Sequence, residues 1–548
     1  MNRGERRSAQ RRQRLARPGQ RGAPQGRPPP DTSVLLEAAR SRHGAGRLSE
    51  AAELYRRLLA GDPQNAEALL QFGAVEFQLG RLAQAFALVE RSIALRPEHP
   101  FGWLLLSTLM IAGENLAGAA AACQSALALA PGLAAAHAGQ GDVWAASEKF
   151  DLAAAAYRQA VTLEPKYVEA WINLGTALFR QGRIEEAVAA HRQALSLRPD
   201  HAHAYRNLAT AWRELGRLDL ALAAYRRATE LAPDFAEAHR DEALLLLLLG
   251  RYEEGWAKYE WRWRANERGA RLAEGRRWMG ENIEGRTILL QSEQGAGDTI
   301  QFLRYVPLVA GRGGRVVVDL PNSLLRLVQT GLSGVAEVRD RDLPPPQFDC
   351  CAPLLSLPHI FGTTMGTIPA AIPYLHAPAS YVEEWRGDFA GLRRPLVGLA
   401  WAGNPDQEND RNRSIEFERL KPLIDAGSAQ FVSLQVGARS ADPASSGVTS
   451  MVELPARLTD FCETAGAIMN LDLVITVCTS VAHLAGALGK PVWLLLPFVP
   501  SWRWLLARDD SSWYPTMRLF RQKTSGAWDE VIAQVGRELA AFAAPRQN

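Results

Sequence analysis

The 548-residue sequence lacks the markers of several common protein classes. It holds only five cysteines, an odd number, and no two of them form a Cys-x-x-Cys pair. Such a set predicts neither a disulfide framework nor a zinc site, and it favours a reducing, cytoplasmic compartment. The motif His-Glu-x-x-His is absent as well, so we expect no metal centre.

Long apolar runs are also missing. The longest, residues 243–249 and 491–500, are far shorter than the roughly 20 apolar residues of a membrane-spanning helix. The sequence therefore predicts no transmembrane segment.

Net positive charge is missing from most of the chain, although the whole sequence carries +3. Residues 1–30 hold nine arginines and one acid, a net charge of +8, which leaves −5 for the remainder. A mildly acidic body is a poor surface for nucleic acid, so we expect no specific nucleic-acid partner. Residues 1–31 lack the apolar core of a secretory signal and predict a disordered tail; binding of acidic lipid or RNA by this tail is the less favoured alternative.

The first half of the chain does contain a strict repeat. Prolines recur at a constant spacing of 34 residues, each followed by a large residue after six positions and a small residue after 22. Proline ends a helix, small residues let two helices approach closely, and large residues fill the gap to the next pair. The prolines are Pro63, Pro97, Pro131, Pro165, Pro199 and Pro233. Glycines mark the turns inside four of the pairs, at Gly80, Gly182, Gly216 and Gly250.

This pattern resembles the tetratricopeptide repeat, whose period is 34 residues. We expect an all-α solenoid over residues 32–266, with six full repeats over about 32–235 and a degenerate seventh over about 236–264. Its concave surface is expected to bind a protein or peptide; the alternative is that the array only spaces or oligomerises the second half, and the oligomeric state stays open.

The repeats can also be compared with those of the protein O-linked N-acetylglucosamine transferases, which they resemble. In that family a ladder of asparagines along the inner groove holds the substrate backbone. The resemblance makes Asn173 and Asn207 candidate partner-binding residues. The other four corresponding positions carry no asparagine, so a continuous ladder is absent.

The second half changes character after residue 264. A polar linker over 267–285 is followed by short β-branched runs that alternate with helical ones, at 287–290, 315–320, 396–401, 431–436, 473–477 and 492–496. Alternation of this kind favours parallel sheets with crossover helices. We predict one lobe over 286–392 and a second over 393–548, with a cleft at the carboxyl ends of the strands for a nucleotide-linked substrate.

Three segments of the second half carry candidate chemistry. The turn Gly-Ala-Gly-Asp (295–298) places Asp298 in a first helical turn, as either a capping carboxylate or a base aimed into the cleft. The loop that holds Arg411 and Arg413 either grips a diphosphate or pairs with Asp410 at the surface. Other candidates follow the strand at 473–477.

Thr479 and Ser480 begin the helix after that strand. Its N-terminal amides form an anion site, and His483 lies one turn further on. A lone histidine on a helix is usually structural; beside an anion site, a functional role is the competing interpretation.

Together these segments resemble the heptosyltransferase-like glycosyltransferases of the GT-B fold, in the bacterial form that carries tetratricopeptide repeats. The resemblance covers residues 297–299, 410–414, 479–489 and the aromatic stretches 502–504 and 513–515, in that order. It implies two Rossmann-like lobes and an inverting, metal-independent transfer of a sugar from a nucleotide-diphosphate donor, without a cofactor.

The same resemblance implies roles for particular residues. Asp298 is the base on the acceptor hydroxyl, and Arg411 or Arg413 meets the donor phosphate. The remaining donor-binding positions are Gly297, Cys478, Thr479, Ser480 and His483.

Cys478 departs from the family, which usually has an aspartate there against the donor sugar. Three interpretations stay open: inert packing in a lapsed site, a pocket re-tuned for another donor, and a reactive thiol, of which the last is least favoured. Two functional hypotheses follow. One is a glycosyltransferase whose repeats recruit a protein or glycan acceptor; the other is a non-catalytic repeat scaffold with a degenerate transferase domain.

Overall fold

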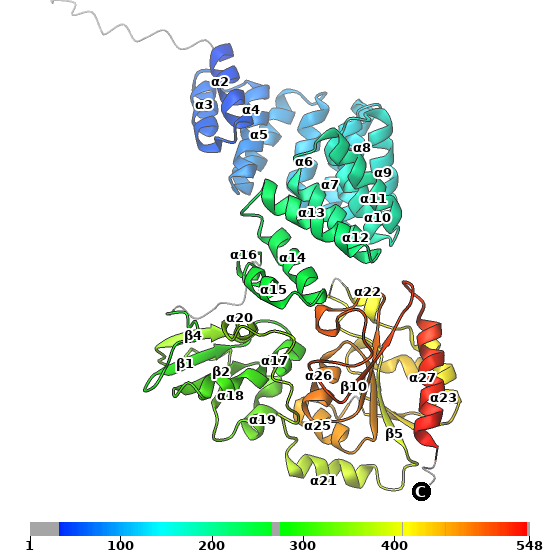
Figure 1. The fold of residues 1–548 in the computed structure, drawn as a ribbon. Helices are drawn as coiled ribbons and strands as arrows, with labels where there is room; N and C mark the ends of the chain where they lie inside the picture. Colours follow the sequence, from blue (N-terminus) through cyan, green and yellow to red (C-terminus); the bar gives the residue numbers. More distant parts are fainter. Residues whose placement is uncertain (1–31, 266–274, 408, 455, 545–548) are drawn as a thin grey trace, which may run out of the picture. The chain divides into compact units, whose positions relative to one another are not determined.

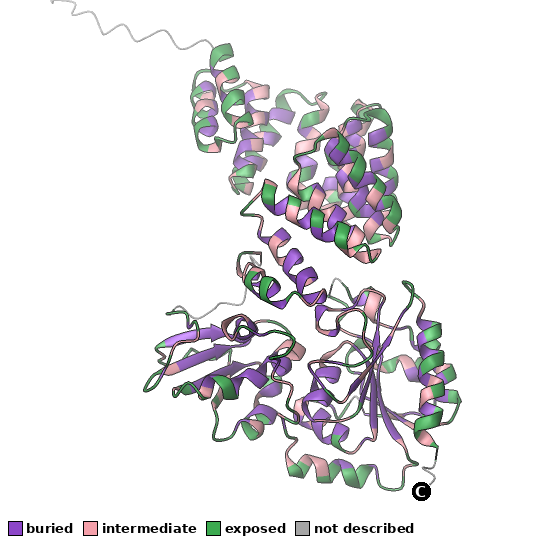
Figure 2. Ribbon diagram, viewed as in Figure 1, coloured by how far each residue is buried: buried purple, intermediate pink, exposed green. Residues whose placement is uncertain are grey.

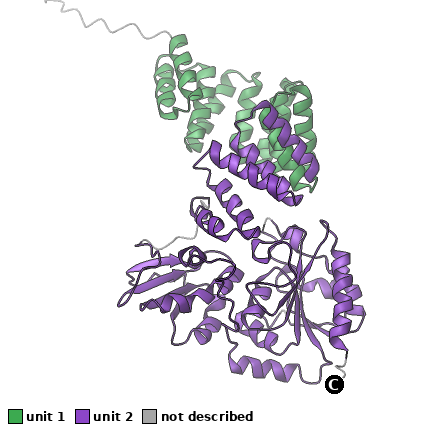
Figure 3. Ribbon diagram, in the orientation of Figure 1, with its two compact units in different colours: residues 1–183 green, residues 184–548 purple. Residues whose placement is uncertain are grey.

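The computed structural model describes residues 32–265, 275–407, 409–454 and 456–544 (Figure 1). The predicted tail over 1–31 lies outside the described residues. The chain divides into two compact units, Met1–Arg183 and Ile184–Asn548 (Figure 3). The division falls inside the repeat array, whereas the sequence suggested a boundary at the end of the array, near residue 266.

Helices occur in pairs from the first described residue onward. The first unit holds α2 (Thr32–Gly44), α3 (Leu48–Gly61), α4 (Ala66–Gln78), α5 (Leu82–Leu95), α6 (Pro100–Ala112), α7 (Leu116–Leu129), α8 (Ala134–Ala146), α9 (Phe150–Leu163) and α10 (Val168–Arg180). The second unit continues with α11 (Ile184–Leu197), α12 (Ala202–Glu214), α13 (Leu218–Leu231), α14 (Ala236–Leu248), α15 (Tyr252–Tyr259) and the short α16 (Arg262–Ala265). In chain order α2 to α15 make seven pairs, which confirms the predicted all-α solenoid.

The small residues of the repeat allow the two helices of a pair to touch. A Cβ atom added at Gly141 in α8 would lie 2.5 Å from the ring of Tyr157 in α9, and one at Gly73 would lie 2.6 Å from Val89. Real Cβ contacts are never that short, so a larger side chain would force the helices apart.

Each turn between paired helices needs a left-handed residue. Gly80 has φ +76°, and the backbone N–H groups of Gly80 and Arg81 donate to Phe77 and Glu76 at 2.9 Å each. This is the glycine-terminated helix end that satisfies the last carbonyl groups. Two repeats place Glu114 (φ 61°) and Glu148 (φ 57°) at the position that glycine occupies elsewhere.

The second half of the chain contains two parallel sheets. The first has the order β3-β2-β1-β4, with Leu289 of β1 opposite Val317 of β2. Its strands are β1 (Thr287–Gln291), β2 (Arg315–Leu320), β3 (Glu337–Asp340) and β4 (Cys350–Pro353). The second has the order β10-β9-β8-β5-β6-β7, with Leu399 of β5 opposite Ile475 of β8. Its strands are β5 (Leu396–Ala400), β6 (Gln430–Ser433), β7 (Val452–Glu453), β8 (Leu473–Val477), β9 (Val492–Leu496) and β10 (Met517–Arg521).

Helices cover the faces of both sheets, so the central strands are buried throughout (Figure 2). This is the usual environment of parallel strands and explains their continuous apolar runs. The covering helices include α17 (Ala296–Phe302), α18 (Val306–Ala310), α19 (Asn322–Gly331), α20 (Leu357–Ile360), α21 (Ala379–Asp388), α22 (Asp410–Arg413), α23 (Lys421–Asp425), α24 (Asp442–Ser445), α25 (Phe461–Met469), α26 (Ser480–Ala487) and α27 (Trp528–Ala543). An α/β region of parallel sheets therefore follows the solenoid, as expected.

The predicted linker over 267–285 is only partly a linker. Residues 266–274 lie outside the described residues, but Trp278 and Ile283 are buried. The backbone N–H of Trp278 donates to the carbonyl of Cys351 in β4 at 3.0 Å. Two large apolar side chains in an otherwise polar segment anchor it to the first sheet, which the polar composition concealed.

The last repeat packs directly into the α/β core of the second unit. Trp256 in α15 meets Trp502 edge-on at 5.1 Å between ring centroids, and its indole N–H donates to the carbonyl of Thr363 at 3.1 Å. Arg262 forms a two-pronged ion pair with Glu293 at 2.8 Å, and both side chains are buried. The final hairpin is thus part of the core on which the sheets rest.

Candidate functional site

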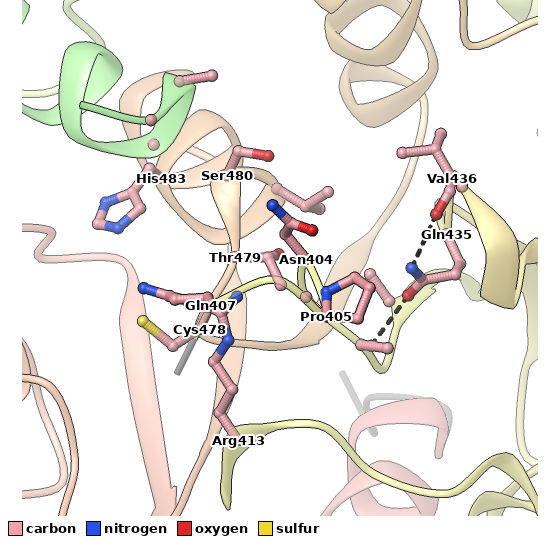
Figure 4. A pocket seen from close by; sticks show the side chains of 18 of the residues that line it. Asn404, Pro405, Gln407, Arg413, Gln435, Val436, Cys478, Thr479, Ser480 and His483 are labelled. Carbon is pink, nitrogen blue, oxygen red and sulfur yellow. Dashed lines mark hydrogen bonds between the residues drawn. The ribbon is translucent and has the colours of Figure 1, made fainter. Parts of the chain in front are cut away.

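One cavity of about 800 Å³ opens where strands of both sheets end (Figure 4). Its lining includes Asp298 from the turn after β1, Arg413 from the loop after β5, Gln435 after β6 and Cys478 after β8. Ligands of open parallel sheets bind at the carboxyl ends of the strands, so this is the expected place for a site. The structure brings together most of the residues singled out in the sequence: Gly297, Asp298, Arg413, Cys478, Thr479, Ser480 and His483.

Asp298 both caps a helix and lines the cavity. Its Oδ2 accepts a hydrogen bond from the backbone N–H of Gly295 at 3.2 Å, while Oδ1 forms an ion pair with Arg503. The two interpretations of this carboxylate therefore do not compete, because the capping oxygen and the ion-paired oxygen are different atoms. The side chain is 23% exposed and accessible from the cavity.

Arg503 is a site residue that the sequence analysis missed. It lies in the 3₁₀ turn η5 (Trp502–Trp504) and its guanidinium stacks on Trp502 at 4.3 Å from the ring centroid. Besides the ion pair with Asp298 it donates to Gln301 Oε1 and, at 3.2 Å, to Ser501 Oγ. The sequence did hold a hint of this role, because Arg503 stands between two tryptophans in the stretch 502–504, which is part of the resemblance to the transferases.

Arg413 is fixed in the cavity by its neighbours. Its Nε donates to Asp410 Oδ1 at 2.9 Å and its Nη1 donates to the carbonyl of Cys478 at 3.0 Å. The buried Asp410 also accepts from Ser414 Oγ at 2.9 Å. Gly403 leaves the room for this arrangement, because a Cβ there would lie 2.1 Å from Arg413 Nη2.

Arg411 does not line that cavity. It lines a smaller pocket of about 220 Å³ with Glu214 of α12 and Trp528 of α27. Of the two candidate arginines, Arg413 is therefore the one placed to meet a ligand held at the strand ends. The predicted pairing of this loop with Asp410 is also present, but it is buried rather than at the surface.

The start of α26 approaches the Gly-Ala-Gly-Asp turn closely. A Cβ at Gly297 would lie 3.0 Å from His483 Cδ2 and 3.4 Å from Ser480 Cα, so a larger residue would crowd this approach. Thr479 is the N-cap residue, in an extended conformation, and its hydroxyl lies 3.4 Å from that of Thr476. The N-terminus of α26 therefore faces the cavity next to Gly297, which has no side chain to separate them.

His483 is buried and neutral. Burial, followed by the positive charges of Arg503 and Arg304, holds the pKa of its imidazole well below the ordinary value. Its Nδ1 lies 2.9 Å from the hydroxyl of Tyr514. A neutral ring held by one nitrogen can offer a hydrogen bond through the other without adding charge.

Cys478 is engaged through both its sulfur and its carbonyl. The indole N–H of Trp504 donates to Sγ at 3.1 Å, and the carbonyl accepts from Arg413. Figure 4 shows Cys478 grouped with Gln407 and Arg413, with Gln435 and Val436 lying apart from them in the view. The three interpretations of this cysteine stay open.

The two candidate partner-binding asparagines lie in different compact units. Asn173 in α10 donates to Asp142 Oδ1 at 3.1 Å, which also accepts from the hydroxyl of Tyr157 at 2.6 Å. Burial raises the pKa of Asp142. Asn173 therefore has a structural contact between repeats that the ladder comparison did not anticipate, and Asn207 lies half-buried on α12.

No group of three or more His, Cys, Asp or Glu side chains among the described residues is arranged to hold a metal ion. Within the same residues, no helix has the length and apolar character to cross a membrane.

Comparison with protein-family models identifies the repeats. Models of the tetratricopeptide repeat match residues 42–109, 104–168, 139–202, 172–234 and 208–260. The chain therefore carries tetratricopeptide repeats, followed by the α/β region described above. A curated relative, Protein FlbA of Caulobacter vibrioides, is 26% identical and aligns over 53% of this chain and 53% of its own length. The match thus spans about half of that relative.

Solved structures resemble parts of the chain. The APC/C hetero-tetramer Cut9-Hcn1 aligns with 40% of this chain and 44% of its own, at 20% identity and a TM-score of 0.38. The tetratricopeptide protein YrrB aligns with 35% of this chain at 20% identity and a TM-score of 0.27. Pseudomonas aeruginosa pilF aligns with 38% of this chain and 92% of its own, at 17% identity and a TM-score of 0.33.

Proposed function

We propose that the protein is a glycosyltransferase of GT-B type that uses a nucleotide-diphosphate sugar, and that its repeats recruit the protein or glycan acceptor. The observation that supports this most directly is the convergence of one carboxylate, Asp298, and three arginines, Arg413, Arg439 and Arg503, on one cavity at the strand ends of both sheets. Such a cavity suits a phosphorylated ligand lying between two lobes. The order of the segments that resemble the GT-B glycosyltransferases supports sugar transfer as the reaction.

The chemistry divides between the two sides of the cavity. Asp298 accepts the proton of an acceptor hydroxyl as that oxygen attacks the anomeric carbon of the donor. The bond between this carbon and the diphosphate oxygen breaks, and the nucleoside diphosphate leaves with the bonding electrons. Arg413, the amides that begin α26 and neutral His483 stabilise the charge on the leaving group.

Binding of nucleoside diphosphates tests the proposal first. Full-length protein is titrated with uridine, guanosine, adenosine and cytidine diphosphates in a calorimeter, and nucleotide sugars of the best binder are then tested for turnover. We expect one diphosphate to bind clearly better than the others. Failure of all four to bind would count against the transferase.

Substitution of the base tests the mechanism. Asp298→Asn keeps the size of the side chain and an oxygen for the Gly295 N–H, but it cannot accept the proton. We expect turnover to fall by about 10²- to 10⁴-fold without loss of donor affinity. An equal loss of donor binding would reduce Asp298 to a helix cap.

The alternative is a repeat scaffold whose transferase region is inactive. Cys478 favours it, because its sulfur is occupied by the Trp504 indole where the related transferases present a carboxylate. Cys478→Asp, assayed beside the parent on the same donor panel, separates the interpretations. A gain for one donor indicates a lapsed site, a loss from an active parent indicates a re-tuned pocket, and no binding by either protein supports the scaffold.

A further inference from the structure

We propose that Arg503 is a positioning residue shared between Asp298 and the donor: it pairs with the carboxylate in this structure and turns to the diphosphate when the donor binds. This inference rests on the proposed function and deepens it. In this proposal Asp298 is released from its ion pair, and can act as the base, only when Arg503 binds the donor.

The contacts of Arg503 explain why it competes between two anions. Its Nη2 holds Asp298, and no other acid lines the cavity among its described residues. Arg413, in contrast, is already committed to Asp410 and to the carbonyl of Cys478. Arg439, the third arginine of the cavity lining, pairs with Glu416 at 3.4 Å, outside that lining. Arg503 is therefore the cavity arginine whose partner is itself the proposed base.

The position of Arg503 brings it within the donor side of the cavity. Its neighbour Trp504 donates to Cys478 Sγ, directly before α26, and stacks against His483 at 5.5 Å between ring centroids. After burial, the charge of Arg503 is the next cause that lowers the pKa of His483, as expected for a guanidinium close to this ring. A diphosphate held at the start of α26 would lie within the field of this guanidinium.

Movement of Arg503 toward a donor would break one further contact. Gln301 accepts from Arg503 through Oε1, and this bond is lost when the guanidinium turns away. The new contacts to the diphosphate must exceed this cost.

A consequence separates this role from a purely structural one. If Asp298 holds Arg503 away from the donor, neutralising Asp298 releases the arginine and strengthens binding of the diphosphate. We expect Asp298→Asn to bind the best nucleoside diphosphate about three- to tenfold more tightly than the parent, the range for breaking one partly exposed ion pair. Simple charge repulsion by Asp298 predicts such a gain with or without Arg503.

A double-mutant cycle distinguishes the two explanations. Binding of the diphosphate is measured by calorimetry for the parent, Asp298→Asn, Arg503→Gln and the double variant. We expect Arg503→Gln to bind about tenfold more weakly, and the gain from Asp298→Asn to vanish in that background. A gain that persists or grows without the arginine overturns the inference.

Controls keep the outcome readable. Arg503→Lys retains the cation, so the gain from Asp298→Asn should survive in it; its loss there would contradict a shared charge. Arg518→Gln removes an arginine that pairs with Glu538 away from the cavity and should change nothing. If the parent binds none of the four diphosphates, the proposed function fails and this inference with it, whereas an additive cycle in a binding parent overturns the inference alone.

Discussion

Among the glycines that line the candidate cavity, Gly403 has the least room for a side chain. An added Cβ would lie 2.1 Å from Arg413 Nη2 and 2.5 Å from Asp410 Oδ1. The backbone N–H of Gly403 also donates to Ser414 Oγ at 3.0 Å. Because glycine has no side chain, Gly403 leaves room for Arg413, Asp410 and Ser414 to contact one another.

Gly403→Ala should therefore mimic loss of the arginine. We expect it to weaken binding of the preferred nucleoside diphosphate by about 1.5–3 kcal/mol, as Arg413→Ala does, because the guanidinium must leave its place. Calorimetry of the three proteins measures this. Gly387→Ala is the matched control, since open space surrounds that position, and equal affinities for Gly403→Ala and the parent would refute the argument.

His191 on α11 carries a prediction about pH. Burial lowers the pKa of its imidazole to about 4, and its Nδ1 has no partner within the described residues. The unfolded chain, with an ordinary pKa near 6.5, binds the proton first, so stability is complete above pH 6.5 and is lost as the pH falls toward 4.

Substituting this histidine should flatten the pH dependence. Between pH 7 and pH 5, protonation of His191 in the unfolded state removes about 2 kcal/mol of stability from the second unit. Urea unfolding of the parent and of His191→Leu at both pH values measures the difference. His203→Gln, at an exposed position, should behave as the parent, and an unchanged pH dependence in His191→Leu would contradict the assignment.

Among the elements, the turns inside the helix pairs do not all have glycine at the left-handed position. Five turns use glycine at the left-handed position and two use glutamate, at φ 61° and 57°. A side chain with a Cβ is strained there. The repeat tolerates this because each turn contributes only one such residue.

Glu148→Gly should stabilise the first unit. Relief of the left-handed strain favours the variant by about 1 kcal/mol, partly offset by the greater freedom of glycine in the unfolded chain. Thermal unfolding measures the change. Gly80→Ala is the reverse experiment, since open space surrounds its Cβ and only the backbone is strained; a rise in stability there would contradict the reasoning.

The sequence predicted the elements unevenly, for physical reasons. Six strands with continuous apolar runs were placed with ends that agree to within about one residue, except that the run over 431–436 extends three residues beyond β6. The constant proline spacing indicated all seven helix pairs. Strand β3 reads Glu-Val-Arg-Asp, β4 contains a proline and β7 has two residues, so these three carry no strand pattern. Strand β10 was not predicted either, because two arginines interrupt its apolar residues.

The residues of the candidate site were likewise predicted only where the local sequence has a pattern. Asp298 and Thr479 were singled out because each lies in the segment that follows an apolar strand. Arg503 was missed because its partner Asp298 lies 205 positions earlier in the chain, and no local pattern reports a contact of that kind.

At the scale of the whole second unit, the repeats and the α/β region share one framework. Asn412 of the loop that holds Arg413 donates to Glu214 at the end of α12 at 2.9 Å. The turn at Gly216 approaches Phe498, where an added Cβ would lie 2.9 Å from the ring. With the Trp256 contacts, these tie two successive hairpins, α12–α13 and α14–α15, to the lobes.

Truncations should reveal this framework. A chain of residues 184–548 keeps the contacts and should bind the preferred diphosphate within about threefold of the full-length protein. A chain of residues 267–548 exposes the apolar surface that α14 and α15 cover, and we expect it to aggregate. Gel filtration and calorimetry test both, and a soluble, binding-competent 267–548 would show that the last hairpins are dispensable.

The burial of Trp256 against Trp502 also limits how this architecture can change over generations. A duplicated 34-residue repeat inserted before Arg183 would be flanked by similar repeats, and it would leave the sequence of Ile184–Asn548 unchanged. The same insertion just before Trp256 would separate the tryptophans. The array can therefore lengthen or shorten at one end only, and homologous chains should align when their repeats are numbered backward from Trp256, whatever their number.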